Sequence, residues 1–441
     1  MLLVSLAYLL LTVSAASVPS QARANVPDAE IQDLMGDGTT GATSDLSAGI
    51  GAEFETPEIM LKNAKCSKAD TDDFKKSVIA GRKDPGGLWA LTADTTSKAG
   101  LLHLEYIMDG KNIKVGSGKA KNAGKEAAAD FAAWSPWDGT DTSKIKVGAG
   151  KCDPWAIDGA TKGKTKAASV NWMAQVTAPM PLEGLYSLML EQAKDLDIAE
   201  RNILSGAETK RTGKSGSANL VLATKSYFQS KPQGIEQTKV TNDMLGFVSL
   251  VLSYAKGAQY LLQSDESPKL MTTFMPRTEF NTIFKQVKSK FSGDLFKLFE
   301  VLACYKSKVS KKADGTYTVT VGLDKDFCTG TTAAPVPIKD KFAGLEFKNA
   351  KKSINIKTWI TGIGAGTGSV DGLSEFDTSI DGSIGGLKTA TEHVYNTQRA
   401  VPLFEFRDLV HYPTTSEFES FMSQADQTIQ ELHKKFATAP S

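Results

Sequence analysis

The stretch LLHLEYIMDG, residues 101–110, carries the strongest local signal for the fold of this chain of 441 residues. Its first eight residues are mostly apolar and include aromatic and β-branched side chains, which favours a β-strand. The Asp-Gly pair that follows indicates a tight turn, and an Asp-Gly between two extended runs is a strong hairpin signal. We therefore expect residues 112–116 to form the second strand of a hairpin.

Strand-like, turn-rich sequence surrounds this hairpin from residue 53 to residue 176, a region that holds five of the six tryptophans. From residue 177 to residue 305 the spacing of apolar residues becomes helical. Helices are predicted to start near Leu182, to cover residues 244–262, and to cover residues 280–302 with a break at Gly293. A β-rich half followed by a helical middle predicts an α+β fold, because alternating βαβ units would mix the two periods.

The C-terminal region, residues 306–441, is predicted to open with a β-hairpin that turns at Asp314-Gly315. A proline-containing linker at 333–337 follows, then a strand over 353–360 and a glycine-rich loop through residue 386. The last element is an amphipathic helix over residues 416–436. Ser416 and Glu419 have the spacing of a capping box at its start.

The N-terminus is predicted to be a secretory signal peptide. Residues 2–13 are almost wholly apolar and lead into small residues at 14–17, the pattern of such signals. The segment is too short to cross a bilayer core of about 30 Å as a helix. We expect the signal to cover residues 1–16, or alternatively 1–24, and a flexible leader to cover 25–52. No later stretch predicts a stable membrane span, so the mature protein is expected to be secreted and extracellular.

Four cysteines follow the signal, and an even number in a secreted chain indicates disulfides. Four cysteines allow three pairings, of which we favour Cys304–Cys328 and Cys66–Cys152. The first pair would tie the end of a helix to the end of a hairpin. A disulfide that closes a loop of such a length stabilises the folded protein by about 3–5 kcal/mol. The cysteine spacing does not match a zinc site, so no metal site is predicted.

Composition excludes one class of partner. The chain has 51 basic and 50 acidic side chains, whereas nucleic-acid binding depends on a basic surface that neutralises phosphate. No nucleic-acid partner is expected. The glycine-rich segment 363–368 has no glycine at the third position that a dinucleotide motif requires. No cofactor is therefore predicted. An acidic loop at 371–381 offers oxygen ligands to calcium, but not at EF-hand spacing.

Catalytic motifs are missing. Neither G-x-S-x-G nor H-E-x-x-H occurs. Among the four histidines, His103 lies within an apolar strand and is interpreted as a core residue. Glu392 with His393 is the most site-like pair. Glycosidases need only two carboxyl groups at about 5–9.5 Å, and such a pair cannot be identified from spacing along the chain.

Tryptophans offer the clearest binding candidates. Trp134, Trp137 and Trp155 lie close together in a turn-rich segment. Exposed planar rings suit sugar faces and protein hot spots, because they bury much area at little entropic cost. The alternative interpretation is that the same rings pack into the core of their own sheet.

A short segment resembles a known family. Glu392-His393-Val394, with Gln398 four residues later, resembles an E-H-V-x-x-x-Q element beside the catalytic domain of fungal killer-toxin-like chitinases. There, as in residues 404–436 here, an aromatic-rich helix follows. The resemblance implies a fungal-type secreted protein. The catalytic barrel and acidic motif of those chitinases are missing here, so chitinase activity is not implied.

Three functional hypotheses follow. The first is a disulfide-bonded binding protein of toxin, effector or surface-interaction type, which recognises a glycan or an extracellular or host protein. The second is an extracellular hydrolase of glycosidase type that uses paired carboxylates, with Glu392 and His393 as candidates. The third is a structural or storage protein.

Overall fold

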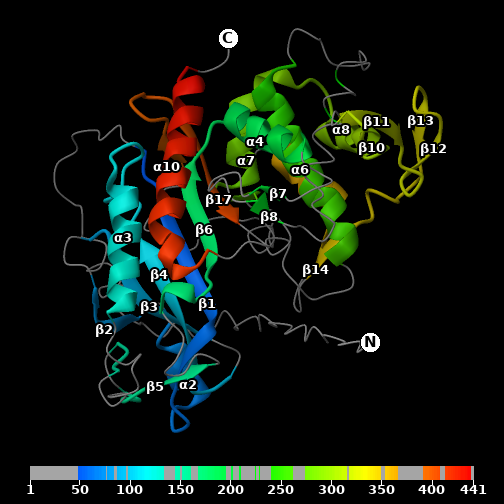
Figure 1. Cartoon of the computed structure of the whole chain (residues 1–441). Coiled ribbons are helices and arrows are strands. Elements are labelled where there is room, and N and C mark those ends of the chain that lie inside the picture. Colours follow the sequence, from blue (N-terminus) through cyan, green and yellow to red (C-terminus); the bar gives the residue numbers. More distant parts are fainter. Residues whose placement is uncertain are drawn as a thin grey trace.

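The computed structural model describes residues 48–75, 77–83, 87–95, 98–133, 145–148, 151–159, 167–194, 200–201, 208–209, 224, 228, 240–261, 274–314, 317–348, 353–365, 391–407 and 413–438 (Figure 1). The predicted signal peptide, most of the predicted leader and the acidic loop at 371–381 lie outside these residues. So do Trp134 and Trp137. Residues 48–52, assigned to the leader from the sequence, instead belong to the fold, because Ala48 and Ile50 are fully buried.

The main sheet is antiparallel and draws its strands from both ends of the chain. Its order is β16-β17-β6-β1-β4-β3-β2, with β5 paired to β1 and β9 paired to β17. The bounds are β1 Gly51–Lys62, β2 Val78–Lys83, β3 Trp89–Thr95, β4 Leu101–Met108, β5 Ala156–Gly159, β6 Met173–Pro179, β9 Phe274–Pro276, β16 Thr391–His393 and β17 Ala400–Arg407. Since β17 pairs with β6, residues near the C-terminus complete the sheet that the N-terminal half begins.

Two helices cover one face of this sheet. Helices α3 (Lys119–Ala132) and α10 (Phe418–Lys435) lie side by side across it (Figure 1). Beneath them the rings of Tyr106, Trp172 and Phe418 form a cluster with centroids 5.4–5.9 Å apart. Aromatic pairs at such distances stabilise a core beyond the area that they bury, so this cluster anchors the C-terminal helix to the N-terminal strands.

The remaining helices form a second layer beyond β6 and β17 (Figure 1). Their bounds are α4 Leu182–Lys194, α6 Asn242–Leu261, α7 Phe280–Val287, α8 Leu295–Leu302 and α9 Ile356–Ala365. The other described elements are a short helix, α2 (Lys68–Asp72), three 3-10 turns (Ala167–Ser169, Lys288–Lys290 and Thr415–Glu417) and four two-stranded ribbons. The ribbons pair β7 Glu200–Arg201 with β8 Glu208–Thr209, β10 Tyr305–Lys311 with β11 Tyr317–Leu323, β12 Cys328–Gly330 with β13 Pro335–Pro337, and β14 Glu346–Lys348 with β15 Ser353–Asn355. The α+β prediction is confirmed.

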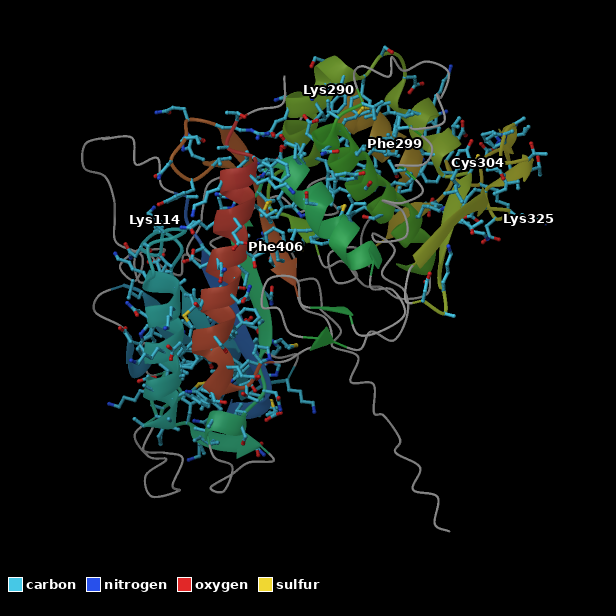
Figure 2. The ribbon with its side chains drawn as sticks, turned by 45° about the horizontal axis from the view of Figure 1, so that its top comes forward. Lys114, Lys290, Phe299, Cys304, Lys325 and Phe406 are labelled. Atoms are coloured by element: carbon cyan, nitrogen blue, oxygen red, sulfur yellow. A yellow bond between two sulfur atoms is a disulfide. The ribbon has the colours of Figure 1, made fainter. Side chains whose placement is uncertain are left out.

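Two disulfides are present, Cys66–Cys152 and Cys304–Cys328, which is the pairing that the sequence favours. Cys304 follows α8, the helix that carries Phe299, and its partner begins β12. Figure 2 places Phe299 and Cys304 on the side of the helical layer that faces the β10–β13 ribbons. The bond thus ties a helix end to a ribbon.

The predicted hairpin after β4 is wrong in its second strand. Ile113 and Val115 do not pair with β4. Ile113 O instead accepts the Ile50 N–H at 2.9 Å, and the Val115 N–H donates to Ala48 O at 2.9 Å. The reason lies in the turn, where the Asp109 carboxylate accepts the Lys111 N–H at 2.9 Å and closes an Asx turn. The chain therefore leaves the hairpin path and enters α3.

The predicted strand over 353–360 is also wrong beyond residue 355. Asn355 Oδ1 accepts the Thr358 N–H at 2.7 Å, a contact typical of a helix N-cap. Trp359, Ile360 and Ile363 then bury one side of α9, a helical spacing that the β-branched composition of the segment hides.

Smaller differences concern a cap and a linker. The capping box uses Thr414 and Glu417, two residues before the predicted pair Ser416 and Glu419, and caps the 3-10 turn Thr415–Glu417 that leads into α10. The predicted linker at 333–337 contains strand β13. None of the helices in the described part of the chain is long and apolar enough to cross a membrane.

Candidate active site on the polar face of the sheet

Strand alternation gives the main sheet one apolar face and one polar face. In β1, Phe54 packs against Phe418 of α10, with ring centroids 4.2 Å apart. Successive side chains of a strand point to opposite faces, so the residues on either side of Phe54 lie on the face away from α3 and α10. We call it the carboxylate face and define it by Glu53, Glu55, Glu105 and Glu405.

Two of these residues oppose each other directly. Glu55 of β1 and Glu105 of β4 are register partners in an antiparallel pair. Such partners lie on the same face with Cβ atoms about 4.5–5.5 Å apart, a separation at which like charges repel. The register therefore places two carboxyl side chains beside each other on the carboxylate face.

The two carboxyl groups have different surroundings. The Glu55 side chain is 21% exposed, and its Oε1 lies 2.9 Å from His103 Nδ1. Glu105 is only 2% exposed, and the Thr92 hydroxyl donates to its Oε2 at 3.3 Å. Different environments are what separate an acid from a base in a carboxylate pair.

The carboxylate face continues inward across β6 to β17. Glu405 of β17 is register partner to Thr177 of β6, and both are buried, with 1% and 0% of their surface exposed. Arg277, which follows β9, holds its Nη1 3.7 Å from Glu405 Oε2. The face therefore runs from partly open at Glu55 to closed at Glu405.

Carboxylate oxygens are common metal ligands, so the carboxylate face was compared with a metal site. Among the described residues, no group of three or more His, Cys, Asp or Glu side chains is arranged to hold one. Carboxyl groups can also take up or release protons in a reaction.

A carboxyl group with a near-neutral pKa lies outside this face. Burial raises the pKa of Asp109, just beyond β4, to about 6. Its oxygens accept from the Lys111 N–H at 2.9 Å and from Asn112 Nδ2 at 2.8 Å. The Asp109 carboxyl group thus stabilises the turn to which it belongs, and we do not count it as a site residue.

Of the three tryptophans proposed for binding, the structure describes one. Trp155 is 1% exposed, and its ring meets that of Phe74 edge-on at 5.7 Å. The structure therefore places Trp155 in the core and presents no face of its ring to a ligand. Trp134 and Trp137 lie outside the described residues, so a binding role for them stays a prediction.

One histidine is placed differently from its sequence-based interpretation. His103, interpreted as a core residue, lies on the carboxylate face, where its side chain is 18% exposed. His393 ends β16, which pairs with β17 at Ala400. The resemblance of residues 392–398 to the chitinase element stays a prediction.

The carboxylate face was missed because its signal is weak. Glu53-Phe54-Glu55 and Glu105-Tyr106 alternate between acidic and aromatic residues, and such alternation predicts one solvated face. Solvated acidic residues are common, and only the fold shows that Glu105 is buried and opposed to Glu55.

Comparisons with known proteins add little. No protein-family model and no curated protein matches the chain. Among solved structures, the chain is similar to the ACD domain of a VgrG toxin from Vibrio cholerae, a mutant form in complex with ADP and Mn²⁺. The identity is 12% and the TM-score 0.36, over 86% of this chain and 99% of that one.

A second similar structure is a Vibrio cholerae toxin from the MARTX/VgrG family. Its identity is 13% and its TM-score 0.27, over 68% of this chain and 94% of that one. TM-scores of this size do not establish a shared fold, so both remain distant likenesses.

Proposed function

We propose that this chain is a secreted, disulfide-bonded hydrolase that cleaves glycosidic bonds with the opposed pair Glu55 and Glu105. One observation carries the proposal, the direct register partnership of these two carboxyl groups on the carboxylate face. Glycosidases of the retaining class hold their two carboxyl groups close together, about 5–5.5 Å apart, and direct register partners have neighbouring side chains.

The surroundings assign the roles. Glu105 is the more buried of the two, and we assign it as the acid that protonates the leaving oxygen. Glu55 lies against His103 and is assigned as the nucleophile. Its carboxylate forms an ester with the anomeric carbon as the glycosidic bond breaks. Water then cleaves the ester after giving its proton to Glu105.

The test is a hydrolysis screen of the purified mature protein on a panel of polysaccharides and aryl glycosides. We expect sugar release that falls by at least about a hundredfold in Glu105→Gln and in Glu55→Gln, the loss typical of a general acid. Glu126→Gln, on the exposed side of α3, is the matched control and should keep full activity. Full activity in both site variants would contradict the proposal.

The binding-protein hypothesis makes a different prediction for the same screen. It rests on aromatic contacts, of which Trp134 and Trp137 remain candidates. Retention of a glycan without any product would favour a toxin- or effector-type binding protein over the hydrolase. Loss of that retention in Trp137→Ala, with the thermal midpoint unchanged, would then locate the binding surface.

A further inference from the structure

One imidazole lies against the carboxyl group that we assign as the nucleophile. His103 Nδ1 is 2.9 Å from Glu55 Oε1. The two residues are diagonal neighbours across β4 and β1, because Glu55 is the register partner of Glu105, two residues after His103. Diagonal neighbours on one face lie within reach of long and aromatic side chains. The contact therefore follows from the register of the sheet.

This contact has only one direction when Glu55 is ionised, as a carboxylate nucleophile must be. An ionised carboxylate can only accept hydrogen bonds, whereas a ring nitrogen of histidine can donate or accept. Nδ1 of His103 must therefore carry a proton and donate a hydrogen bond to Glu55 Oε1. Hydrogen bonds to a charged acceptor are about twice as strong as neutral ones, so this one holds an oxygen of the carboxylate in place.

Strand β1 has a bulge beside this contact. Its regular pairing with β4 ends at Thr56 and resumes at Met60, the register partner of His103. Pro57 stands at the first position without a partner in β4, and a proline has no N–H to give to a ladder. A thioether is at most a weak acceptor, so Met60 does not compete with Glu55 for the His103 ring. Bulges beside a site commonly direct a side chain toward it.

We propose that His103 is a positioning residue, which fixes the Glu55 carboxylate in the direction of attack by donating one hydrogen bond from Nδ1. This inference rests on the proposed glycosidase function and adds a third residue to the opposed pair. No bond to His103 forms or breaks, because its proton stays on Nδ1 while Glu55 attacks and is released. A reacting group that is misplaced by about 1 Å can cost about a hundredfold in rate.

Two substitutions separate the hydrogen bond from the rest of the ring. The amide nitrogen of asparagine is bonded to Cγ, as Nδ1 of histidine is, so His103→Asn keeps a donor at the same place. The amide nitrogen of glutamine lies one bond further out. On a cleaved aryl glycoside, kcat should fall by about ten- to a hundredfold in His103→Gln, with KM little changed. It should return close to the wild-type value in His103→Asn, and equal losses in both variants would overturn the inference.

The matched control is Asp94→Asn. Asp94 is the register partner of His103 on β3, so it is a second carboxylate on the same face, and the variant should keep full activity. A loss equal to that of His103→Gln would assign the effect to charge near the ring and overturn the inference. In the Glu55→Gln background, His103→Gln should cause no further loss, because a positioning residue acts only through its partner.

A readout without turnover is the proton on Nδ1. Proton–nitrogen NMR of the full mature chain should show a protonated Nδ1 for the ring signal that disappears in His103→Asn. An unprotonated Nδ1 would overturn the inference.

The kinetic outcomes separate this inference from the proposed function. A wild type that releases no sugar would refute the hydrolase, and the role of His103 with it. Sugar release that Glu55→Gln abolishes and His103→Gln leaves unchanged would refute only the role of His103.

Discussion

Lys256 of α6 and Asp324 of the turn after β11 form a buried ion pair, with 2.6 Å between Nζ and Oδ2. The same ammonium donates to Ala303 O at 3.1 Å and to Tyr305 O at 3.2 Å. Lys256 thereby holds both sides of the Cys304–Cys328 disulfide against the helical layer. Burial lowers the pKa of Lys256, and Asp324 opposes that shift.

Lys256→Met is expected to destabilise the fold by about 3–5 kcal/mol, because it leaves the Asp324 carboxylate buried without its main partner. Lys306→Met is the control. Its Nζ lies 3.8 Å from the same carboxylate, but its side chain is 59% exposed, so the cost should stay below about 1 kcal/mol. Equal losses in urea denaturation would contradict this assignment.

Protonation of the buried His433 side chain should lower the stability of the fold at acid pH. The Tyr395 N–H donates to its Nδ1 at 3.1 Å, and Nε2 lies 2.6 Å from Pro179 O, an arrangement that fits the neutral ring. Burial lowers the pKa of His433 from 6.5 to about 4. Between these values the unfolded chain binds more protons. The neutral His433 ring therefore contributes about 3 kcal/mol to the free energy of unfolding. This contribution is complete above about pH 6.5 and disappears as pH falls to about 4.

Denaturant midpoints measured from pH 4 to pH 7 check this dependence. His433→Gln should lose the part of the slope that belongs to this residue. His393→Gln, at the end of β16, should retain it. A wild-type slope in His433→Gln would show that other groups produce the acid sensitivity.

Ionisation of Asp109 should change stability with pH in the direction opposite to His433. The pKa of Asp109 is raised from 3.8 to about 6 by burial, so the folded chain binds more protons between these values. Its contribution falls by about 3 kcal/mol as pH rises through that window. It offsets the gain from His433. Asp109→Asn should therefore make stability rise more steeply from pH 4 to pH 6 than in the wild type, and an unchanged curve would refute the compensation.

Gly124 allows α3 and α10 to approach closely. A Cβ at this position would lie 2.7 Å from the Phe418 carbonyl carbon, a backbone atom that cannot rotate away. Gly124→Ala should destabilise the protein by about 1–3 kcal/mol through overpacking. Gly322→Ala, where nothing lies within 4 Å of the added carbon, should change the thermal midpoint little. A similar loss at both positions would rule out helix contact as the cause.

The opposed carboxyl groups predict the stereochemistry of the proposed reaction. Retaining glycosidases have neighbouring carboxyl groups, whereas inverting ones keep room for a water molecule, and Glu55 and Glu105 are direct register partners. We expect the first product to retain the anomeric configuration of the substrate, which proton NMR of a fresh digest can follow. Inversion would mean that Glu55 activates water instead of attacking the sugar.

Elements whose signals are short in range could be predicted from the sequence. Helix α6, the β10–β11 ribbon and strand β4 follow from periodicity and turn residues. The preference for Cys304–Cys328 came from the same local pattern, since a helix end and a hairpin end flank the two cysteines. The predicted strand over 353–360 failed beyond Asn355, because this side chain caps a helix that the β-branched composition of the segment does not indicate.

Which residues meet depends on how the strands and helices are assembled in the fold. The opposition of Glu55 and Glu105 depends on the register between β1 and β4, and the placement of Glu405 depends on β17 joining β6 from the other end of the chain. Register is set by burial of a whole face, here by Phe54 and Phe418, because a slip of one residue would turn every side chain over. Spacing along a chain contains no such information, and the candidate site therefore emerged from the fold.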